Sequence, residues 1–203
     1  MQIVNFIKDS TVECSPFSWG LTLFSLGCNL HCKMCEGYNY EKVTNPDNVI
    51  GEAIEIIKNN ITPMHDSVVF IGGEPTIWGD KLEAALQFCH DRRLKTKIFS
   101  NGFNCGVIEE INNMGLCDAW SIDFKGLHNI QQEFGVPAQD YLMNVEYSIN
   151  DIARRNLPLE IRTTFYHGNE QWREDIKKYV EQNFISKYSK IKYIKQEDVR
   201  SII

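Results

Sequence analysis

Residues 21–35 have the sequence LTLFSLGCNLHCKMC, in which a short apolar segment leads directly into three cysteines at spacing C-x3-C-x2-C. The apolar segment, residues 21–26, has the composition of a buried β-strand. Three thiols cannot all pair with one another in disulfides, and a closed structural zinc site requires a fourth ligand. The stretch therefore predicts a strand that ends on a loop, with Cys28, Cys32 and Cys35 as candidate ligands of an inorganic centre.

The same alternation of strand and helix continues along the rest of the chain. Apolar and β-branched runs predict strands, and apolar residues at helical spacing predict helices. The predicted strands cover residues 21–26, 67–71, 96–100, 118–123, 159–165 and 191–196. The predicted helices cover residues 48–60, 81–93, 107–114, 141–155 and 170–184. We expect a capping box of Asp80 and Glu83 to open the second helix, and Gly115 to end the third.

Six strands that alternate with helices predict right-handed crossovers and a parallel sheet. Six units are too few for the closed eight-stranded barrel, which is typically about 250 residues long. We therefore predict an α/β fold with a single domain over residues 1–203, an open partial (β/α)6 barrel with parallel strands. Active sites in such sheets lie at the carboxyl ends of the strands, so a functional motif should directly follow a strand.

Composition excludes several classes of protein. The 203 residues are 43% hydrophobic and 24% charged, which is ordinary for a globular domain, and the net charge is −6. This charge provides no basic surface for nucleic acid or anionic lipid, and we see neither a secretory signal nor a membrane span. Seven cysteines without an export signal predict reduced thiols and a cytoplasmic location. We expect four of them to be packing residues: Cys14, Cys89, Cys105 and Cys117.

A second candidate motif follows the strand predicted over residues 67–71, where the chain continues as Gly72-Gly73-Glu74-Pro75. Two glycines allow the backbone to approach a ligand closely and expose main-chain groups to it. A plain strand-to-helix turn would explain this segment if it stood alone. Because the cysteine loop follows the preceding strand, the two motifs together indicate one ligand site at the carboxyl ends of the sheet.

Three thiolates can bind a cubane iron–sulfur cluster and leave its fourth iron open to a ligand that is not part of the protein. A zinc site is the alternative, and it would need a fourth ligand such as His31, which lies between the first two cysteines. An iron–sulfur electron carrier or a zinc-binding adaptor is a further possibility without enzymatic activity. That class leaves the Gly-Gly-Glu-Pro segment unexplained.

The cysteine loop and the Gly-Gly-Glu-Pro segment together resemble those of the radical S-adenosylmethionine (SAM) superfamily, and the resemblance covers nearly the whole chain. It implies a partial (β/α)6 barrel with a [4Fe-4S] cluster on the three cysteines. It also implies SAM bound at the open iron, with the four residues of the Gly-Gly-Glu-Pro segment among its binding residues. Such enzymes reductively cleave SAM to methionine and a 5′-deoxyadenosyl radical, which abstracts hydrogen, while the protein positions the cofactor.

Residues 120–126, WSIDFKG, resemble the Asp-x-Lys pattern of the glycyl-radical-enzyme activases within this superfamily. The resemblance implies that Asp123 helps to fix the cofactor and that Lys125 contacts its carboxylate, a favourable arrangement in a partly dry pocket. A surface ion pair is the structural alternative. The same resemblance implies three further cofactor-binding residues: Ser100 and Asn101 of a Ser-Asn-Gly stretch, and Arg162, for which a salt bridge at the core edge is the alternative.

The small activases without a second cysteine cluster are the most similar subgroup, in particular the activating protein of anaerobic ribonucleoside-triphosphate reductase. This resemblance implies a glycine of a partner glycyl radical enzyme as the substrate, and an electron donor such as flavodoxin or ferredoxin. The activase aspartate before the Asn-Gly pair is replaced here by Phe99, so we do not expect its cation site. Residues 126–140 are long enough to form a docking loop or a small lid.

Radical SAM enzymes that act on free small molecules form the alternative class. The 7-carboxy-7-deazaguanine synthases also contain the sequence GGEPT, which is present here at residues 72–76. Their usual Gln-Gly-Glu-Gly-type N-terminal stretch and the Asp-Thr after the third cysteine are both missing from this sequence. The sequence therefore favours a protein substrate over a metabolite.

Overall fold

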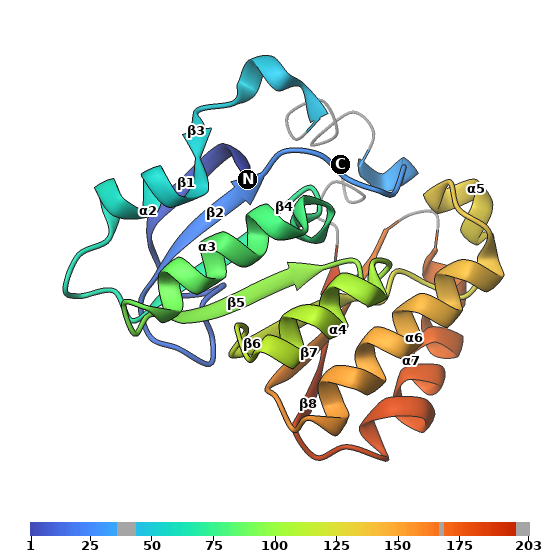
Figure 1. Cartoon of the computed structure of the whole chain (residues 1–203). Coiled ribbons are helices and arrows are strands. Elements are labelled where there is room, and N and C mark those ends of the chain that lie inside the picture. The colour runs from blue at the N-terminus through green and yellow to red at the C-terminus, as the bar shows by residue number, and fades with distance from the viewer. Residues whose placement is uncertain (36–43, 167–168, 198–203) are drawn as a thin grey trace.

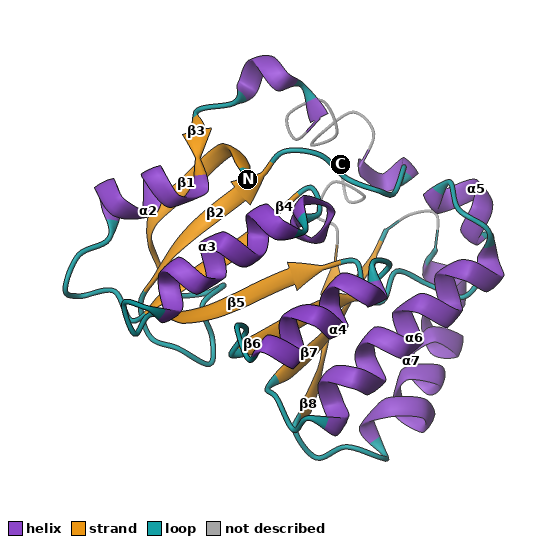
Figure 2. Cartoon of the chain, in the orientation of Figure 1, coloured by secondary structure: helices purple, strands orange, loops and turns teal. Residues whose placement is uncertain are grey.

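The computed structural model describes residues 1–35, 44–166 and 169–197, which form one eight-stranded sheet and the helices that cover it (Figures 1 and 2). The strand order in the sheet is β3-β1-β2-β4-β5-β6-β7-β8. The strands are β1 (Gln2–Ser10), β2 (Gly20–Ser25), β3 (Gly51–Glu52), β4 (Ser67–Gly72), β5 (Lys95–Ser100), β6 (Ala119–Asp123), β7 (Leu159–Phe165) and β8 (Ile191–Glu197).

Six strands run parallel and lie side by side in the order in which they occur along the chain: β2, β4, β5, β6, β7 and β8. They coincide with the six predicted strands to within two residues at either end. Consecutive parallel strands that lie side by side and are joined by helices have the topology of a partial barrel. The predicted α/β fold with parallel strands is therefore confirmed.

Two antiparallel strands that the sequence did not predict extend the sheet beyond β2. Strand β1 pairs with β2 and, along its other edge, with the short β3. The helix predicted from residue 48 was wrong at its beginning, because Gly51 and Glu52 belong to β3 and the amide of Ile50 donates to the carbonyl of Ile3 at 2.8 Å. Helix α2 begins only at Ala53, after these backbone groups have paired with β1.

The helices lie over one face of the sheet (Figure 2). They are α2 (Ala53–Asn60), α3 (Asp80–His90), α4 (Cys105–Met114), α5 (Ile130–Phe134), α6 (Ala138–Arg154) and α7 (Arg173–Val180). Short helical turns are η1 (Lys33–Cys35), η2 (Pro46–Asn48), η3 (Pro75–Trp78) and η4 (Glu170–Trp172), and a π-helical segment, η5 (Glu181–Ile185), follows α7. The last predicted helix, residues 170–184, is thus divided among three of these elements.

The expected ends of two helices had different outcomes. The capping box was wrong, because Asp80 is already the first residue of α3 and Gly79, at φ 42°, precedes it without a side-chain cap. Acidic residues in the first turn still interact favourably with the helix dipole. Gly115 ends α4 as predicted, in the left-handed conformation with φ 68°.

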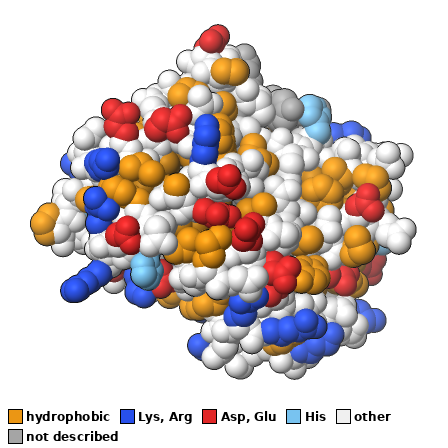
Figure 3. All heavy atoms as spheres, viewed as in Figure 1, with side chains coloured by type: hydrophobic (Ala, Val, Ile, Leu, Met, Phe, Trp, Pro, Cys, Tyr) orange, Lys and Arg blue, Asp and Glu red, His pale blue; other side chains and the backbone are white. Residues whose placement is uncertain are grey.

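The main hydrophobic core lies between the helices and the sheet. Strand residues such as Phe70, Ile98 and Trp120 are fully buried there against Leu82 and Ile108 of the helices. On the outer, helix-covered side, acidic and basic side chains are interspersed with apolar ones (Figure 3). Across residues 1–35, 44–166 and 169–197, no helix combines the length and the apolar character needed to span a bilayer.

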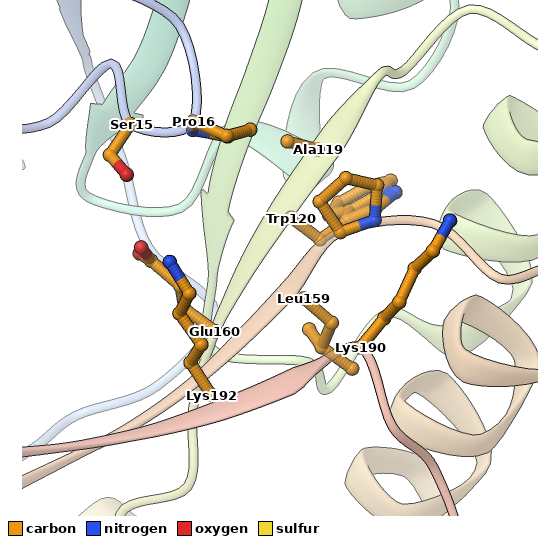
Figure 4. A pocket seen from close by; sticks show the side chains of 9 residues that line it. Ser15, Pro16, Ala119, Trp120, Leu159, Glu160, Lys190 and Lys192 are labelled. Atoms are coloured by element: carbon orange, nitrogen blue, oxygen red, sulfur yellow. The ribbon is translucent and has the colours of Figure 1, made fainter.

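A buried ion pair lies near the amino ends of the parallel strands. Lys97 is 1% exposed, and its Nζ atom lies 2.8 Å from Glu160 Oε2 and 2.7 Å from the carbonyl oxygen of Ser15. A small hollow beside this pair is lined in part by Trp120 and Lys192, at the beginning of β6 and β8 (Figure 4). This hollow is at the opposite end of the sheet from the cysteine loop.

Candidate active site

The predicted site residues gather at the carboxyl ends of the parallel strands. Cys28 follows β2, Gly72 ends β4, Ser100 ends β5 and Asp123 ends β6. Arg162 of β7 is in register with Asp123 on the neighbouring strand. Residues from four separate sequence motifs thus lie at one edge of the sheet, where parallel α/β folds place their chemistry.

The cysteine loop packs against the main core. Cys32 is 6% exposed, and Cys28 and Cys35 are partly buried against the same core. The amide of Cys35 donates to the carbonyl of Cys32 at 2.9 Å, and the amide of Leu30 lies 3.5 Å from Cys28 Sγ. These contacts hold the three thiols on one short segment that is partly shielded from water.

Burial controls the protonation of these thiols. It raises the pKa of Cys28 to about 12, with a further increase from the nearby carboxylate of Glu74. Burial also raises the pKa of Cys32, although the positive charge of Lys125 acts in the opposite direction. Thiols in this environment stay protonated until a metal centre displaces their protons. Among the described residues, no three His, Cys, Asp or Glu side chains are grouped for binding a single metal ion.

Gly72 and Gly73 make the backbone of the next motif fit against the cysteine loop. Gly72 has φ 118°, and a Cβ atom there would lie 2.4 Å from the amide nitrogen of Ser25. A Cβ atom on Gly73 would lie 1.9 Å from the carbonyl oxygen of Gly27. The amides of Gly73 and Glu74 instead donate to Ser25 and Gly27, at 3.1 and 2.7 Å. The close approach expected of these glycines is therefore an approach to β2 and the beginning of the cysteine loop.

The Glu74 carboxylate lies in the interior between these motifs and is 1% exposed. Its Oε1 atom accepts from the amide of Thr76 at 3.1 Å, from Thr76 Oγ1 at 2.7 Å and from Ser100 Oγ at 2.8 Å. Its Oε2 atom accepts from the amide of Asn101 at 2.6 Å. Burial raises the pKa of Glu74, while these four hydrogen bonds act to lower it. The carboxylate joins the Gly-Gly-Glu-Pro segment to the Ser-Asn-Gly stretch.

Two side chains that the sequence analysis missed, Asn29 and Asn104, continue this connection to the cysteine loop. Asn104 Nδ2 donates to Thr76 Oγ1 at 3.1 Å, and Asn29 Nδ2 donates to Asn104 Oδ1 at 3.0 Å. Asn101 Nδ2 then donates to Asn29 Oδ1 at 2.7 Å and lies 3.9 Å from Cys28 Sγ. Asn29 stands next to the first cysteine in the sequence, but nothing in the spacing of the motifs signals a contact 75 residues away.

Asp123 and Lys125 form an ion pair at the end of β6, with Lys125 Nζ 3.1 Å from Asp123 Oδ2. The amide of Lys125 donates to the hydroxyl of Tyr141 at 2.8 Å. Burial opposes the charge of Lys125, but Asp123 and the other neighbouring acidic groups outweigh it and raise the pKa of this lysine. The pair therefore places the Lys125 ammonium within electrostatic reach of the Cys32 thiol.

Arg162 completes the polar lining of this edge. Its guanidinium carbon lies 5.0 Å from the centre of the Phe99 ring, and Lys97 Nζ lies 4.6 Å from the same ring. Within the described part of the chain, the buried Nε atom of Arg162 has no hydrogen-bond partner. A buried donor without a partner is costly, so this atom is suited to an acceptor that a ligand provides.

The segment predicted as a docking loop or lid, residues 126–140, contacts the cysteine loop. The amide of His31 donates to the carbonyl of Phe134 at 3.0 Å. In α5, the Oε1 atom of Glu133 lies 3.6 Å from Lys33 Nζ, and its Oε2 atom accepts from the hydroxyl of Tyr166 at 2.9 Å. This segment therefore connects the cysteine loop with the end of β7.

The sequence model of the family described as "Radical SAM superfamily" matches residues 22–182. The chain belongs to the radical SAM superfamily. A protein of Methanocaldococcus jannaschii that carries the name "Putative glycyl-radical enzyme activating enzyme MJ1227" is 29% identical over 184 residues, which are 88% of this chain and 75% of that protein.

Solved structures of other proteins show the same fold. A structure described as "Native anSMEcpe with bound AdoMet and Cp18Cys peptide" superposes with a TM-score of 0.60 at 15% identity, over 84% of this chain and 48% of that one. A structure described as "Structure of TYW1 with a lysine-pyruvate adduct bound" gives 0.59 at 18% identity, over 89% of this chain and 66% of that one. The chain thus spans about half and about two thirds of these neighbours.

Membership in the radical SAM superfamily implies a [4Fe-4S] cluster and SAM, and the residues of this site fit both groups. A cubane cluster takes one thiolate on each of several irons, so its three cysteines need not converge on a single point. The partly buried thiols of the cysteine loop suit this arrangement. The Lys125 cation and the orphaned Arg162 donor suit the carboxylate of SAM.

Proposed function

We propose that this radical SAM enzyme activates a glycyl radical enzyme by abstracting a hydrogen atom from a glycine of that partner. The ion pair of Asp123 and Lys125 at the end of β6, within electrostatic reach of Cys32, is the observation that carries the proposal. This pair is the feature that resembles the activases most specifically. The name of the Methanocaldococcus jannaschii relative supports the same function.

In this proposal Cys28, Cys32 and Cys35 hold the [4Fe-4S] cluster and leave one iron to SAM. When bound, these two groups supply a one-electron cleavage of the S–C5′ bond that gives methionine and a 5′-deoxyadenosyl radical. The protein shields the reactive groups from water, because the thiols lie partly in the hydrophobic core. Binding of the cluster would displace the protons of Cys28 and Cys32, the two thiols whose pKa burial raises.

The residues that follow the other strands hold SAM. Lys125 would pair with the carboxylate of SAM, and Asp123, its ion-pair partner, would help to fix the cofactor. Arg162 donates from its unpartnered Nε atom to an acceptor of the cofactor. Gly72, Gly73 and Pro75 would line the cofactor site, while Glu74, Ser100 and Asn101 fix that segment through their hydrogen bonds. Most of these side chains position the cofactor and leave the chemistry to it.

The partner loop reaches the site where the sheet is open, next to the segment of residues 126–140. This segment contacts the cysteine loop through His31 and Phe134, so a partner docked on it lies close to the cofactor. We infer that anaerobic ribonucleoside-triphosphate reductase is the partner, and that flavodoxin or ferredoxin provides the electron in the cytoplasm of an anaerobic cell.

The test uses the full chain, reconstituted anaerobically with iron and sulfide and mixed with SAM, dithionite and purified anaerobic ribonucleoside-triphosphate reductase. We expect a glycyl radical signal in electron paramagnetic resonance (EPR) spectra and one 5′-deoxyadenosine for each radical formed. A partner in which the radical glycine is replaced by alanine provides the control and should give no signal. Rapid turnover of a 7-deazaguanine precursor without a protein partner would overturn the proposal in favour of the metabolite-acting class.

A further inference from the structure

An unbroken row of hydrogen-bonded side chains runs through the interior of the site from Glu74 to Cys28. The row passes through Thr76, Asn104, Asn29 and Asn101, in that order. It joins side chains that follow β2, β4 and β5, and Glu74, Thr76 and Asn101 are at most 4% exposed. Four of these six residues lie outside the cysteine loop, so the row connects that loop with two other motifs.

The hydrogen bonds of this row all point in one direction, toward Glu74. Glu74 Oε1 accepts from the amide of Thr76 and from Ser100 Oγ, and the single hydroxyl hydrogen of Thr76 is directed to the same oxygen at 2.7 Å. Thr76 Oγ1 must then accept from Asn104 Nδ2, which turns the Asn104 oxygen toward Asn29 Nδ2. Asn29 in turn presents its oxygen to Asn101 Nδ2 at 2.7 Å. Each amide orientation therefore follows from the one before it.

A backbone contact identifies which atom of the Asn101 amide is the oxygen, while the row holds the nitrogen. The amide of Phe103 donates to Asn101 Oδ1 at 2.9 Å, so the oxygen and the nitrogen of this side chain are identified from both sides. One hydrogen of Nδ2 is directed to Asn29. The other faces Cys28 Sγ, which lies 3.9 Å from the nitrogen.

We propose that this row is a device that positions an N–H donor of Asn101 against the sulfur of Cys28 and thereby raises the reduction potential of the cluster bound there. Hydrogen bonds to the sulfur ligands are one of the means by which a protein sets the potential of an iron–sulfur cluster. A donor stabilises the additional negative charge of the reduced cluster more than it stabilises the oxidised state. Thr76, Asn104 and Asn29 are positioning residues, because they act through Asn101. The inference rests on the proposed cluster, but not on the proposed partner.

The test compares Thr76→Val with Thr76→Ser in the full, cluster-loaded chain. Valine has the shape of threonine without the hydroxyl, so Asn104 loses its acceptor and the row loses its connection to Glu74. Serine retains the hydroxyl. We expect a more negative midpoint potential in EPR-monitored redox titrations of Thr76→Val, a larger shift of the same sign in Asn29→Ala, and the wild-type potential in Thr76→Ser. Full iron and sulfide content shows that the cluster itself is intact.

An unchanged or more positive potential in both Thr76→Val and Asn29→Ala would overturn the proposal, as would a shift in Thr76→Ser equal to that in Thr76→Val.

A second measurement does not require a cluster. In cluster-free, ¹⁵N-labelled protein, the side-chain amide resonances of Asn101, assigned with Asn101→Asp, should move in Thr76→Val and stay in place in Thr76→Ser. Unmoved resonances in Thr76→Val would reject the row even if that variant bound no iron.

The outcome is distinguishable from a failure of the proposed function. If the potential moves as expected but no glycyl radical forms on any partner, the activase function is rejected and the role of the row stands. If the partner is activated normally while the potential of Thr76→Val equals that of the wild type, the activase function stands and the role of the row is rejected.

Discussion

Each end of the sheet buries an ionisable side chain, and the two side chains have different kinds of polar partner. At the amino end, Lys97 is 1% exposed and pairs with the opposite charge of Glu160 at 2.8 Å. At the carboxyl end, Glu74 is also 1% exposed but is held by neutral donors, the amides and hydroxyls of Thr76, Ser100 and Asn101. Burial lowers the pKa of Lys97 and raises that of Glu74.

This difference distinguishes the cluster at the amino end from the cluster that we propose to act in the site. The charges of Lys97 and Glu160 compensate each other, so the cluster at the amino end is complete within itself. Within the described residues, the Glu74 carboxylate has no cation among its hydrogen-bond partners, and it accepts from donors of two motifs. The polar contacts at this end continue to Cys28, whereas those at the amino end stop at the carbonyl of Ser15.

The largest effect is expected where the carboxyl-end cluster meets the cysteine loop. Cys32→Ala should abolish cluster binding and SAM cleavage, because a cluster with one thiolate removed loses a ligand that no neighbour replaces. Iron content and anaerobic absorption spectra measure the loss. Cys89→Ala is the matched control, since Cys89 is equally buried but lies on α3. Loss of the cluster in Cys89→Ala as complete as in Cys32→Ala would contradict the ligand assignment.

The parallel strands were predictable because each is a short run of β-branched and aromatic residues, as in residues 67–71. Residues 2–10 and 51–52 escaped prediction, because they become strands only through pairing with β2 and with each other. The same pairing makes α2 shorter than the helix predicted from residue 48. The apolar residues at helical spacing begin at Val49, but Gly51 and Glu52 pair with β1, so the helix begins only at Ala53. Tertiary contacts thus decided the elements at the edge of the sheet, and local sequence decided those at its centre.

The site was predictable to the extent that motifs mark it. Spacing identified the cysteines, and glycines before Glu74 marked a close approach of backbones. Spacing could not identify Asn29 and Asn104 as partners, because their contact depends on how two loops fold over the ends of the strands. The sequence likewise gave no indication that Lys97, within a predicted strand, is a buried ion-pair partner.

Removal of one partner should break the amino-end cluster and leave the carboxyl end intact. Glu160→Ala leaves Lys97 buried without its counter-ion, so we expect the free energy of unfolding to fall by about 3–5 kcal/mol in urea titrations. The double variant Lys97→Met with Glu160→Leu should recover most of this loss, because it removes both charges. The exposed pair of Lys95 and Asp118 offers a control, since Lys95→Ala should cost at most about 1 kcal/mol. An equal loss in the two single variants would contradict the comparison.

Lys125 tests whether the charges at the carboxyl end bind a ligand. Lys125→Ala should weaken SAM binding by about 1.5–3 kcal/mol, the range for a hydrogen bond to a charged group. Isothermal calorimetry of the cluster-loaded chain measures the affinity. Lys95→Ala, at the amino end of β5, should leave the affinity unchanged. If Lys125→Ala bound SAM as tightly as the wild type, Lys125 would be part of a surface ion pair with Asp123 and nothing more.

The smallest expected effect concerns the backbone that joins the two loops at the carboxyl end. In Gly73→Ala the new methyl group would lie 1.9 Å from the carbonyl oxygen of Gly27, so one of the two segments must move. We expect a loss of about 1–3 kcal/mol in the free energy of unfolding, the usual range for overpacking. Because the displaced segment leads into the cysteine loop, iron content after reconstitution should also fall. The control is Gly106→Ala in α4, where nothing lies within 4 Å of the new methyl group and a small gain in stability is expected. If Gly73→Ala retained full stability and full iron content, the contact between the Gly-Gly-Glu-Pro segment and the cysteine loop would not be what positions the thiols.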